Sequence, residues 1–196
     1  AAYTSSLQSA QVDFTNPASI SAPETLNVAG STKVKGLEVD VTLVPVRGLT
    51  IGANYAFTDF GTRAVTNPFS NLVELLNISN TPRHAFSASF DYDFGTTAVG
   101  RPRLHLDADN VGGYFASAVP STDPNKNART WLINGRLSLS ELPLLGENLE
   151  IAAWAKNLTN RTYQQTDFIV PTGAGNNFTA FYNEPRSYGV ELRLRF

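Results

Sequence analysis

The chain has neither cysteine nor methionine, although it is 196 residues long. Without cysteine it can form no disulfide framework and carry no thiolate chemistry. A primary translation product begins with methionine, so we expect this chain to be processed or cut from a longer protein. It also opens without the basic and apolar stretch of a leader peptide.

Long apolar runs are missing as well. No run approaches the eighteen residues that indicate a membrane-spanning helix. A transmembrane barrel remains possible, because its strands alternate and never score as hydrophobic, so the mean hydropathy of -0.16 excludes nothing. The net charge of -2 and the pI near 5.7 argue against a basic surface for nucleic acid. The length suffices for one domain with a sizeable core.

What the sequence does contain is alternation with the period of a β-strand. In the last segment Tyr188, Val190, Leu192, Leu194 and Phe196 share one face, opposite Gly189, Glu191, Arg193 and Arg195. Comparable segments occupy residues 34–45, 49–57, 84–94, 101–111, 131–140 and 148–158. A weaker one between Tyr3 and Phe14 brings the expected number of strands to eight.

The connections between these segments alternate in length. Short links such as Pro45 to Gly48 follow long polar ones, which run over about 58–81, 117–128 and 164–183. Outer-membrane barrels show this asymmetry, with short periplasmic turns and long extracellular loops. Several segments have nine to eleven residues, enough to cross a bilayer when tilted, whereas soluble strands average five or six. Residues 72–78, LVELLNI, are the only helix-like stretch, which we interpret as decoration of a loop.

Aromatic residues concentrate near both ends of the expected strands, where a bilayer has its two interfaces. The alternative is that aromatic residues simply favour strands. At the long-loop end lie Tyr55, Phe57, Tyr114, Phe115, Trp131, Tyr163 and Tyr188, and at the other end Tyr92, Phe94 and Phe196.

The last strand indicates which face would meet lipid. A basic residue on the lipid face costs about 2–4 kcal/mol at the midplane of the bilayer. A register slip by one residue would expose Glu191, Arg193 and Arg195 to lipid together. We therefore expect the apolar face to look outward and the charged face to look into a wet or plugged interior.

The end of the chain resembles a known signal and a known family. Residues 187–196, SYGVELRLRF, resemble the C-terminal assembly signal of bacterial outer-membrane proteins. Ala152 to Gln164, a long loop and then YNEPRSYGVELRLRF together resemble the closing hairpin of TonB-dependent outer-membrane receptors. KVKGLEVDVTLVPVRGLTIGANYAF and Thr81 to Phe86, TPRHAF, resemble earlier strands of that family. The resemblance covers about Val34 to Phe196.

The resemblance implies an all-β fold, an antiparallel transmembrane β-barrel segment of about eight strands. Family barrels have 22 strands and a lumen closed by a separate N-terminal plug, so residues 1–196 would be the C-terminal portion without the plug. The implied function is active import, without enzymatic chemistry or cofactor, of siderophore-bound iron, cobalamin or a saccharide across a Gram-negative outer membrane. The implied partners are outer-membrane lipid and lipopolysaccharide, the barrel-assembly machinery, the TonB complex through the missing N-terminal part, and a small-molecule ligand.

Two sets of residues are candidate sites. The assembly signal would comprise Tyr188, Gly189, Leu192, Leu194 and Phe196. The last long loop could contact ligand through Asn176, Asn177, Phe178, Phe181 and Tyr182, although ordinary loop sequence explains this composition equally well.

Catalytic and metal sites have little support in the sequence. His105 lies near Asp107 and Asp109 on the expected inner face, where polar residues lining a hydrated interior are the simpler explanation. The segment 107–110, DADN, lacks the glycine and distant glutamate of a calcium loop. The DYD segment at 91–93 places two acids on one face. Four glycosylation sequons begin at Asn77, Asn157, Asn160 and Asn177, and we discount them in a bacterial setting.

Three alternatives to an importer segment remain. A complete eight-stranded barrel with a structural or anchoring role would need a first strand that pairs with residues 186–196. An outer-membrane hydrolase would need a Ser–His pair on one face, whereas Ser87 and His84 fall on opposite faces. A soluble β-sandwich should have shorter strands and more even loops.

Overall fold

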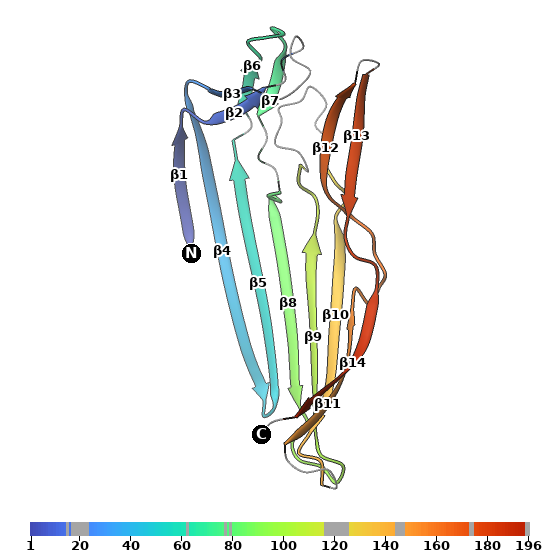
Figure 1. Cartoon of the computed structure of the whole chain (residues 1–196). Coiled ribbons are helices and arrows are strands. Elements are labelled where there is room, and N and C mark those ends of the chain that lie inside the picture. Colours follow the sequence, from blue (N-terminus) through green and yellow to red (C-terminus); the bar gives the residue numbers. More distant parts are fainter. Residues whose placement is uncertain are drawn as a thin grey trace.

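A computed structural model describes residues 1–14, 16, 24–61, 63–76, 78, 80–115, 126–143, 148–172 and 175–194. The backbone is all-β over this part of the chain (Figure 1). The strands are β1 (Ala2–Gln8), β2 (Gln11–Phe14), β3 (Glu24–Asn27), β4 (Ser31–Val46), β5 (Leu49–Phe60), β6 (Arg63–Thr66), β7 (Val73–Leu76), β8 (His84–Asp93), β9 (Arg101–Val111), β10 (Thr130–Ser140), β11 (Leu149–Lys156), β12 (Gln164–Thr172), β13 (Gly175–Tyr182) and β14 (Ser187–Leu194). Within the described ranges, no helix is long and apolar enough to cross a membrane.

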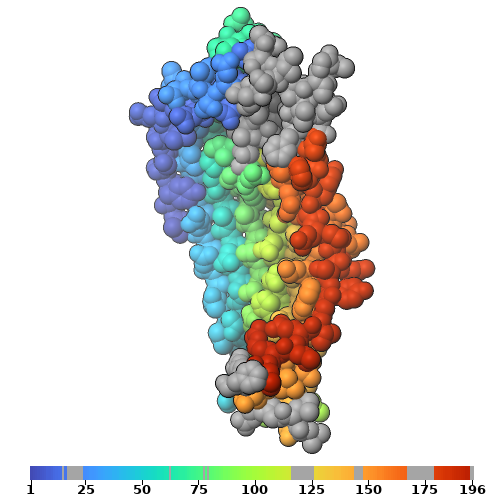
Figure 2. All heavy atoms as spheres, in the orientation of Figure 1, coloured from blue at the N-terminus to red at the C-terminus, as the bar shows by residue number. Residues whose placement is uncertain are grey.

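Eight strands form one antiparallel sheet in the order β1-β4-β5-β8-β9-β10-β11-β14. This order follows the chain once the three short hairpins β2–β3, β6–β7 and β12–β13 are set aside. Figure 2 shows the strands side by side from the N-terminal edge to the C-terminal edge. The sheet is open, because β1 and β14 lie at its two edges. The described residues therefore do not form the closed eight-stranded barrel that the sequence left as an alternative.

The connections at the two ends of the sheet differ as predicted. At the turn end, β4 and β5 are joined by Arg47 and Gly48, and short links join β8 to β9 and β10 to β11. At the loop end, hairpins β2–β3, β6–β7 and β12–β13 are inserted between the long strands (Figure 1). Only the first part of the weakly alternating segment Tyr3 to Phe14 belongs to the long sheet, since Ala2–Gln8 pairs with Leu37–Ser31 of β4 and Gln11–Phe14 forms β2 in a separate hairpin.

The first turn is tighter than the sequence suggested. Pro45 belongs to β4, at a register shift between Leu43 and Val46. Proline has no N–H to donate, so the ladder is interrupted at this residue. The reversal itself needs only two residues, and Gly48 adopts a positive φ of 87° that is easily reached without a side chain.

The prediction of a helix-like stretch at residues 72–78 is wrong. Val73–Leu76 form β7, which pairs with β6 in a hairpin. Seven residues are too few for a helix to be stable without packing. Packing here favours the strand, because Leu76 lies against the small core of Val12, Phe14 and Val65.

That core holds hairpins β2–β3 and β6–β7 together at the loop end, and we call the two hairpins the cap. Phe14 is fully buried, and Ala10, Val28, Phe69 and Leu76 pack around the centre of the core. Asn67 is also fully buried and accepts a hydrogen bond from the Phe69 N–H at 2.9 Å. The connections from β1 to β4 and from β5 to β8 therefore form one packed unit rather than separate loops.

Candidate functional site

The eight-stranded sheet has one apolar face. The register aligns odd-numbered residues of β4 and β5 with even-numbered residues of β8 and β9, so their apolar side chains point the same way. The odd-numbered residues of β10 and the even-numbered residues of β14 continue this face. Its large hydrophobic side chains that are between 36% and 78% exposed are Leu37, Val39, Val41, Leu43, Phe86, Leu106, Trp131, Leu137, Tyr188, Val190, Leu192 and Leu194. A soluble protein rarely exposes so continuous an apolar surface. The apolar face is therefore suited to contact lipid.

Aromatic residues lie on this face near both ends, as expected. Near the loop end, Tyr55 packs on Phe86 with ring centroids 4.7 Å apart, and its hydroxyl lies 2.9 Å from Nδ1 of His84. Near the turn end, Tyr92 and Phe94 make an edge-to-face contact at 4.5 Å. Of the residues predicted for these belts, Phe196 lies outside the described residues.

The opposite, polar face carries a network of ion pairs near the turn end. Asp93 pairs with Arg101 at 2.7 Å and Arg103 at 3.2 Å, and Arg101 also reaches Glu141 at 3.2 Å. Asp93 and the two arginines come from adjacent strands, and Glu141 comes from the more distant β10–β11 link. Their charges compensate one another, so the network stabilises the arrangement of neighbouring strands.

A second network joins three strands of the polar face, β10, β11 and β14. Arg136 on β10 contacts Glu150 on β11 at 2.6 Å and Glu191 on β14 at 3.4 Å. Glu191 in turn pairs with Arg193 at 2.7 Å. Arg136, Glu150 and Arg193 line a cavity of about 390 Å³ together with His105 on β9. Three charged residues of the last strand were predicted to avoid lipid. Glu191 and Arg193 lie on the polar face, as predicted, and Arg195 is outside the described residues.

His105 is held between two carboxylates. Its Nδ1 lies 2.6 Å from Asp91, and its Nε2 lies 3.5 Å from Asp107. Asp109, the other acid predicted nearby, lies further along β9 on the same face, opposite Ser87. Within the described ranges, no three His, Cys, Asp or Glu side chains are placed to hold a metal ion. His105 is thus one of several paired polar side chains on the polar face.

The other candidates for chemistry are separated by the fold. His84 pairs with Phe57 and belongs to the apolar face, whereas Ser87 pairs with Asn54 on the polar face. Asp91 and Asp93 share the polar face but bind different partners, His105 and Arg101. The separation of Ser87 and His84 leaves this pair without the geometry of a hydrolase.

Asn157 follows β11 and is buried. Its backbone N–H and both polar atoms of its side chain make hydrogen bonds. Its N–H donates to Oδ1 of Asn134 at 2.9 Å, and its Nδ2 donates to the carbonyl of Arg161 at 2.8 Å and of Glu184 at 3.2 Å. Its Oδ1 accepts from the Arg161 N–H at 2.9 Å. This one side chain ties the end of β11 to the start of the final strand, so its sequon has a structural role.

The proposed assembly signal lies on β14, where Tyr188, Leu192 and Leu194 expose their side chains on the apolar face. Gly189 faces Trp154 across the β11–β14 ladder. A Cβ built on Gly189 would lie only 2.8 Å from Cζ2 of Trp154, so the indole covers this position. Phe196 is outside the described residues.

The proposed ligand-contacting loop is the hairpin β12–β13. Asn176, Asn177 and Phe178 lie on β13, with their side chains outside the described set. Phe181 and Tyr182 are exposed near the end of this strand. The hairpin stands at the loop end of the sheet, beyond β11 and β14 (Figure 1).

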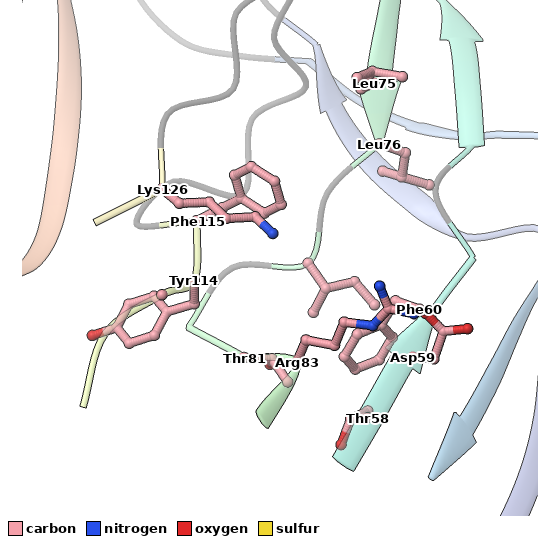
Figure 3. A pocket seen from close by; sticks show the side chains of 12 residues that line it. Thr58, Asp59, Phe60, Leu75, Leu76, Thr81, Arg83, Tyr114, Phe115 and Lys126 are labelled. Atoms are coloured by element: carbon pink, nitrogen blue, oxygen red, sulfur yellow. Dashed lines mark ion pairs between the residues drawn. The ribbon is translucent and has the colours of Figure 1, made fainter. Parts of the chain in front are cut away.

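A pocket of about 170 Å³ lies at the loop end between β5, β7 and the start of the β9–β10 connection. In Figure 3, Asp59 and Arg83 face each other on one side and Tyr114, Phe115 and Lys126 lie on the other. Arg83 pairs with Asp59 at 3.0 Å, and the Lys126 ammonium lies 4.9 Å from the centre of the Phe115 ring. Burial raises the pKa of the Tyr114 hydroxyl, which donates to the Gln165 carbonyl at 3.3 Å.

Sequence reasoning missed the cap, the contact of Trp154 with Gly189, and this pocket. The alternation in Gln11–Phe14 was the one available signal for the cap, since Val12 and Phe14 fall on one face. Several of the residues that pack against Val12 and Phe14 come from segments that are distant in sequence.

Comparison with known proteins is consistent with this geometry. The family described as "TonB dependent receptor-like, beta-barrel" matches residues 1–158. An uncharacterized TonB-dependent receptor of Haemophilus influenzae is 23% identical over 169 residues, which are 86% of this chain and 46% of that protein.

Among solved structures, the ferric yersiniabactin uptake receptor FyuA of Yersinia pestis matches with a TM-score of 0.67 at 19% identity. The match covers 88% of this chain and 25% of that chain, and at this identity it shows the fold alone. This chain thus spans less than half the length of either relative. Because the family match extends over most of its length, the chain belongs to the TonB-dependent receptor β-barrel family.

Proposed function

We propose that residues 1–196 form the C-terminal portion of the barrel of an outer-membrane TonB-dependent transporter. The observation that carries this proposal is the sheet itself, with an apolar face across β4, β5, β8, β9, β10, β11 and β14 and a network of charges on the other face. Family barrels have 22 strands. An open sheet of eight strands, with β1 and β14 at its edges, agrees with a part of such a barrel.

In this proposal the loop end faces outside the cell and the turn end faces the periplasm. The polar face lines the lumen, where a plug contributed by another part of the protein would contact the ion-pair networks. Import consists of binding and gated passage, with no covalent step. The energy would come from the TonB complex, which contacts a part of the protein beyond these residues.

The cargo is proposed to be a scarce bulky nutrient, namely siderophore-bound iron, cobalamin or a saccharide. The solved relative is named as a ferric yersiniabactin uptake receptor, which makes a ferric siderophore the first class of ligand to test. Hairpin β12–β13, with Asn176, Asn177, Phe178, Phe181 and Tyr182, is the proposed contact surface. Outer-membrane lipid and lipopolysaccharide would surround the apolar face, and the assembly machinery would read Tyr188, Gly189, Leu192, Leu194 and Phe196.

The test uses the full-length protein in its own cells. An antibody against this segment should detect, in outer-membrane fractions, a band several-fold heavier than 21.2 kDa. Uptake of labelled ferric siderophores, cobalamin or oligosaccharides should then require both this protein and TonB. A heat-modifiable band near 21 kDa, or uptake that is unchanged without TonB, would overturn the proposal.

A further inference from the structure

A second pocket, of about 220 Å³, lies under the cap on the polar-face side of the sheet. We call it the cap pocket, and Leu7, Val12, Thr32, Phe60, Leu76 and Ile78 supply most of its lining. Leu7 pairs with Thr32 across β1 and β4, which places both on the polar face at its loop end. Val12 and Thr32 are buried, whereas Leu7 at the rim is half exposed. The cap pocket is therefore an apolar recess with an accessible edge.

One polar atom in this recess has no partner within the described residues. The hydroxyl oxygen of Thr32 is buried, and it makes no hydrogen bond to any other residue that the structure describes. Thr32 is only 6% exposed. Leaving a buried hydroxyl unpaired is unfavourable, because it loses its bonds to water. A buried hydroxyl on the wall of an apolar pocket is well placed to bind a polar atom of a ligand.

The charges around the cap pocket select among ligand groups. Among the described residues that line the pocket, Asp13 is the only charged one, and its side chain is exposed. A carboxylate there disfavours an anionic group and tolerates a neutral one. The size suits a substituted ring, since a cavity of about 150 Å³ already accepts benzene.

We propose that the cap pocket binds a neutral aromatic group that carries one hydrogen-bonding substituent, such as a phenol. The ring would lie against Leu7, Phe60 and Leu76, and its substituent would pair with the Thr32 hydroxyl. This assignment rests on the proposed function, because the cap would face the exterior only in an outer-membrane receptor. It names part of the ligand chemistry and places it at the cap, on the other side of the loop end from hairpin β12–β13 (Figure 1).

The test uses the full-length receptor in lipid nanodiscs, with fluorine NMR of three probes and empty nanodiscs as the reference. 4-Fluorophenol should bind about three- to tenfold more tightly than fluorobenzene, the difference that one hydrogen bond typically makes. 4-Fluorobenzoate should bind more weakly than 4-fluorophenol because of Asp13. Thr32→Val should remove the preference for 4-fluorophenol over fluorobenzene while leaving the binding of fluorobenzene unchanged.

A second pair of variants keeps the test decisive if Thr32→Val does not fold. Leu7→Trp fills the rim of the cap pocket and should abolish binding of 4-fluorophenol. Leu43→Trp adds the same side chain at a similarly exposed residue of the apolar face and should have no effect.

Equal binding of all three probes, or 4-fluorophenol binding that survives Leu7→Trp, would overturn the assignment. If uptake by the wild-type receptor still requires TonB in that case, the proposed function stands and only the cap-pocket assignment fails. If the protein is absent from outer-membrane fractions, the proposed function fails whatever the probes show.

Discussion

At the scale of the residue, Gly189 is the clearest case of a position that only one residue type suits. We expect Gly189→Ala to destabilise the barrel by about 1–3 kcal/mol, because the new methyl group would overlap the Trp154 ring. The free energy of unfolding of the full-length protein in lipid, followed in urea, measures the effect. Gly61→Ala is the matched control, since a Cβ there meets only the Lys33 carbonyl at 3.5 Å. The double variant with Trp154→Leu should recover most of the loss, and no recovery would contradict the overlap.

Asn157 makes a second prediction at this scale. Asn157→Ala should cost about 1–3 kcal/mol, because the part-buried hydrogen bonds of the Asn157 side chain to the backbone of Arg161 and Glu184 are lost. Asn157 has a positive φ of 50°, so alanine also brings backbone strain. Asn71→Ala controls for that strain, because Asn71 is exposed with a φ of 58°. Equal losses in the same urea titration would show that the hydrogen bonds of Asn157 contribute nothing.

At the scale of the element, each long strand has one side suited to lipid and one suited to water. Neighbouring residues of β4 test this directly, since Val41 lies on the apolar face and Thr42 on the polar face. Val41→Arg should destabilise the full-length protein by about 2–4 kcal/mol if it lies near the midplane of the bilayer. Thr42→Arg should cost much less. The amount of each variant that reaches the outer membrane, and its unfolding in lipid, measure the difference, and equal effects would contradict the assignment of the faces.

Most ion pairs of the polar face join different elements, as Arg136 on β10 does with Glu150 on β11. Arg136→Met removes the ion pair between Arg136 and Glu150, whose side chain is largely buried. We expect a loss of about 1–3 kcal/mol in the free energy of unfolding. The double variant Arg136→Met with Glu150→Leu should lose less free energy of unfolding than Arg136→Met alone. A double variant that is worse than the sum of the two single changes would contradict the pairing.

At the scale of the whole molecule, the open sheet leads to a prediction about residues 1–196 expressed alone. Two edge strands with unpaired backbone groups favour association with other chains. We expect the isolated segment to aggregate during refolding into detergent, whereas the full-length protein yields a heat-modifiable monomer. Size-exclusion chromatography and gel mobility with and without heating distinguish the two. A heat-modifiable monomer of the segment near 21 kDa would contradict this prediction.

The sequence predicted much of the long sheet because period two is a local property. Alternation along 34–45 and 187–196 located the strands and their faces correctly. The alternating lengths of the connections located the loop end and the turn end of the sheet. The sequence predicted a helix-like stretch at 72–78 because a short apolar run is ambiguous until its packing partner is known. The long connections looked like loops for the same reason, since the ladders of β2–β3, β6–β7 and β12–β13 join short segments.

The sequence by itself therefore determined the all-β architecture, the apolar and polar faces, and the resemblance to TonB-dependent receptors. Only the tertiary structure decided which charges pair, why Gly189 and Asn157 are needed, and how the cap closes over Thr32. The physical reason is distance along the chain. Side-chain direction follows from neighbouring residues, whereas a pocket wall or an ion pair such as Arg136 with Glu191 joins residues that only folding brings together.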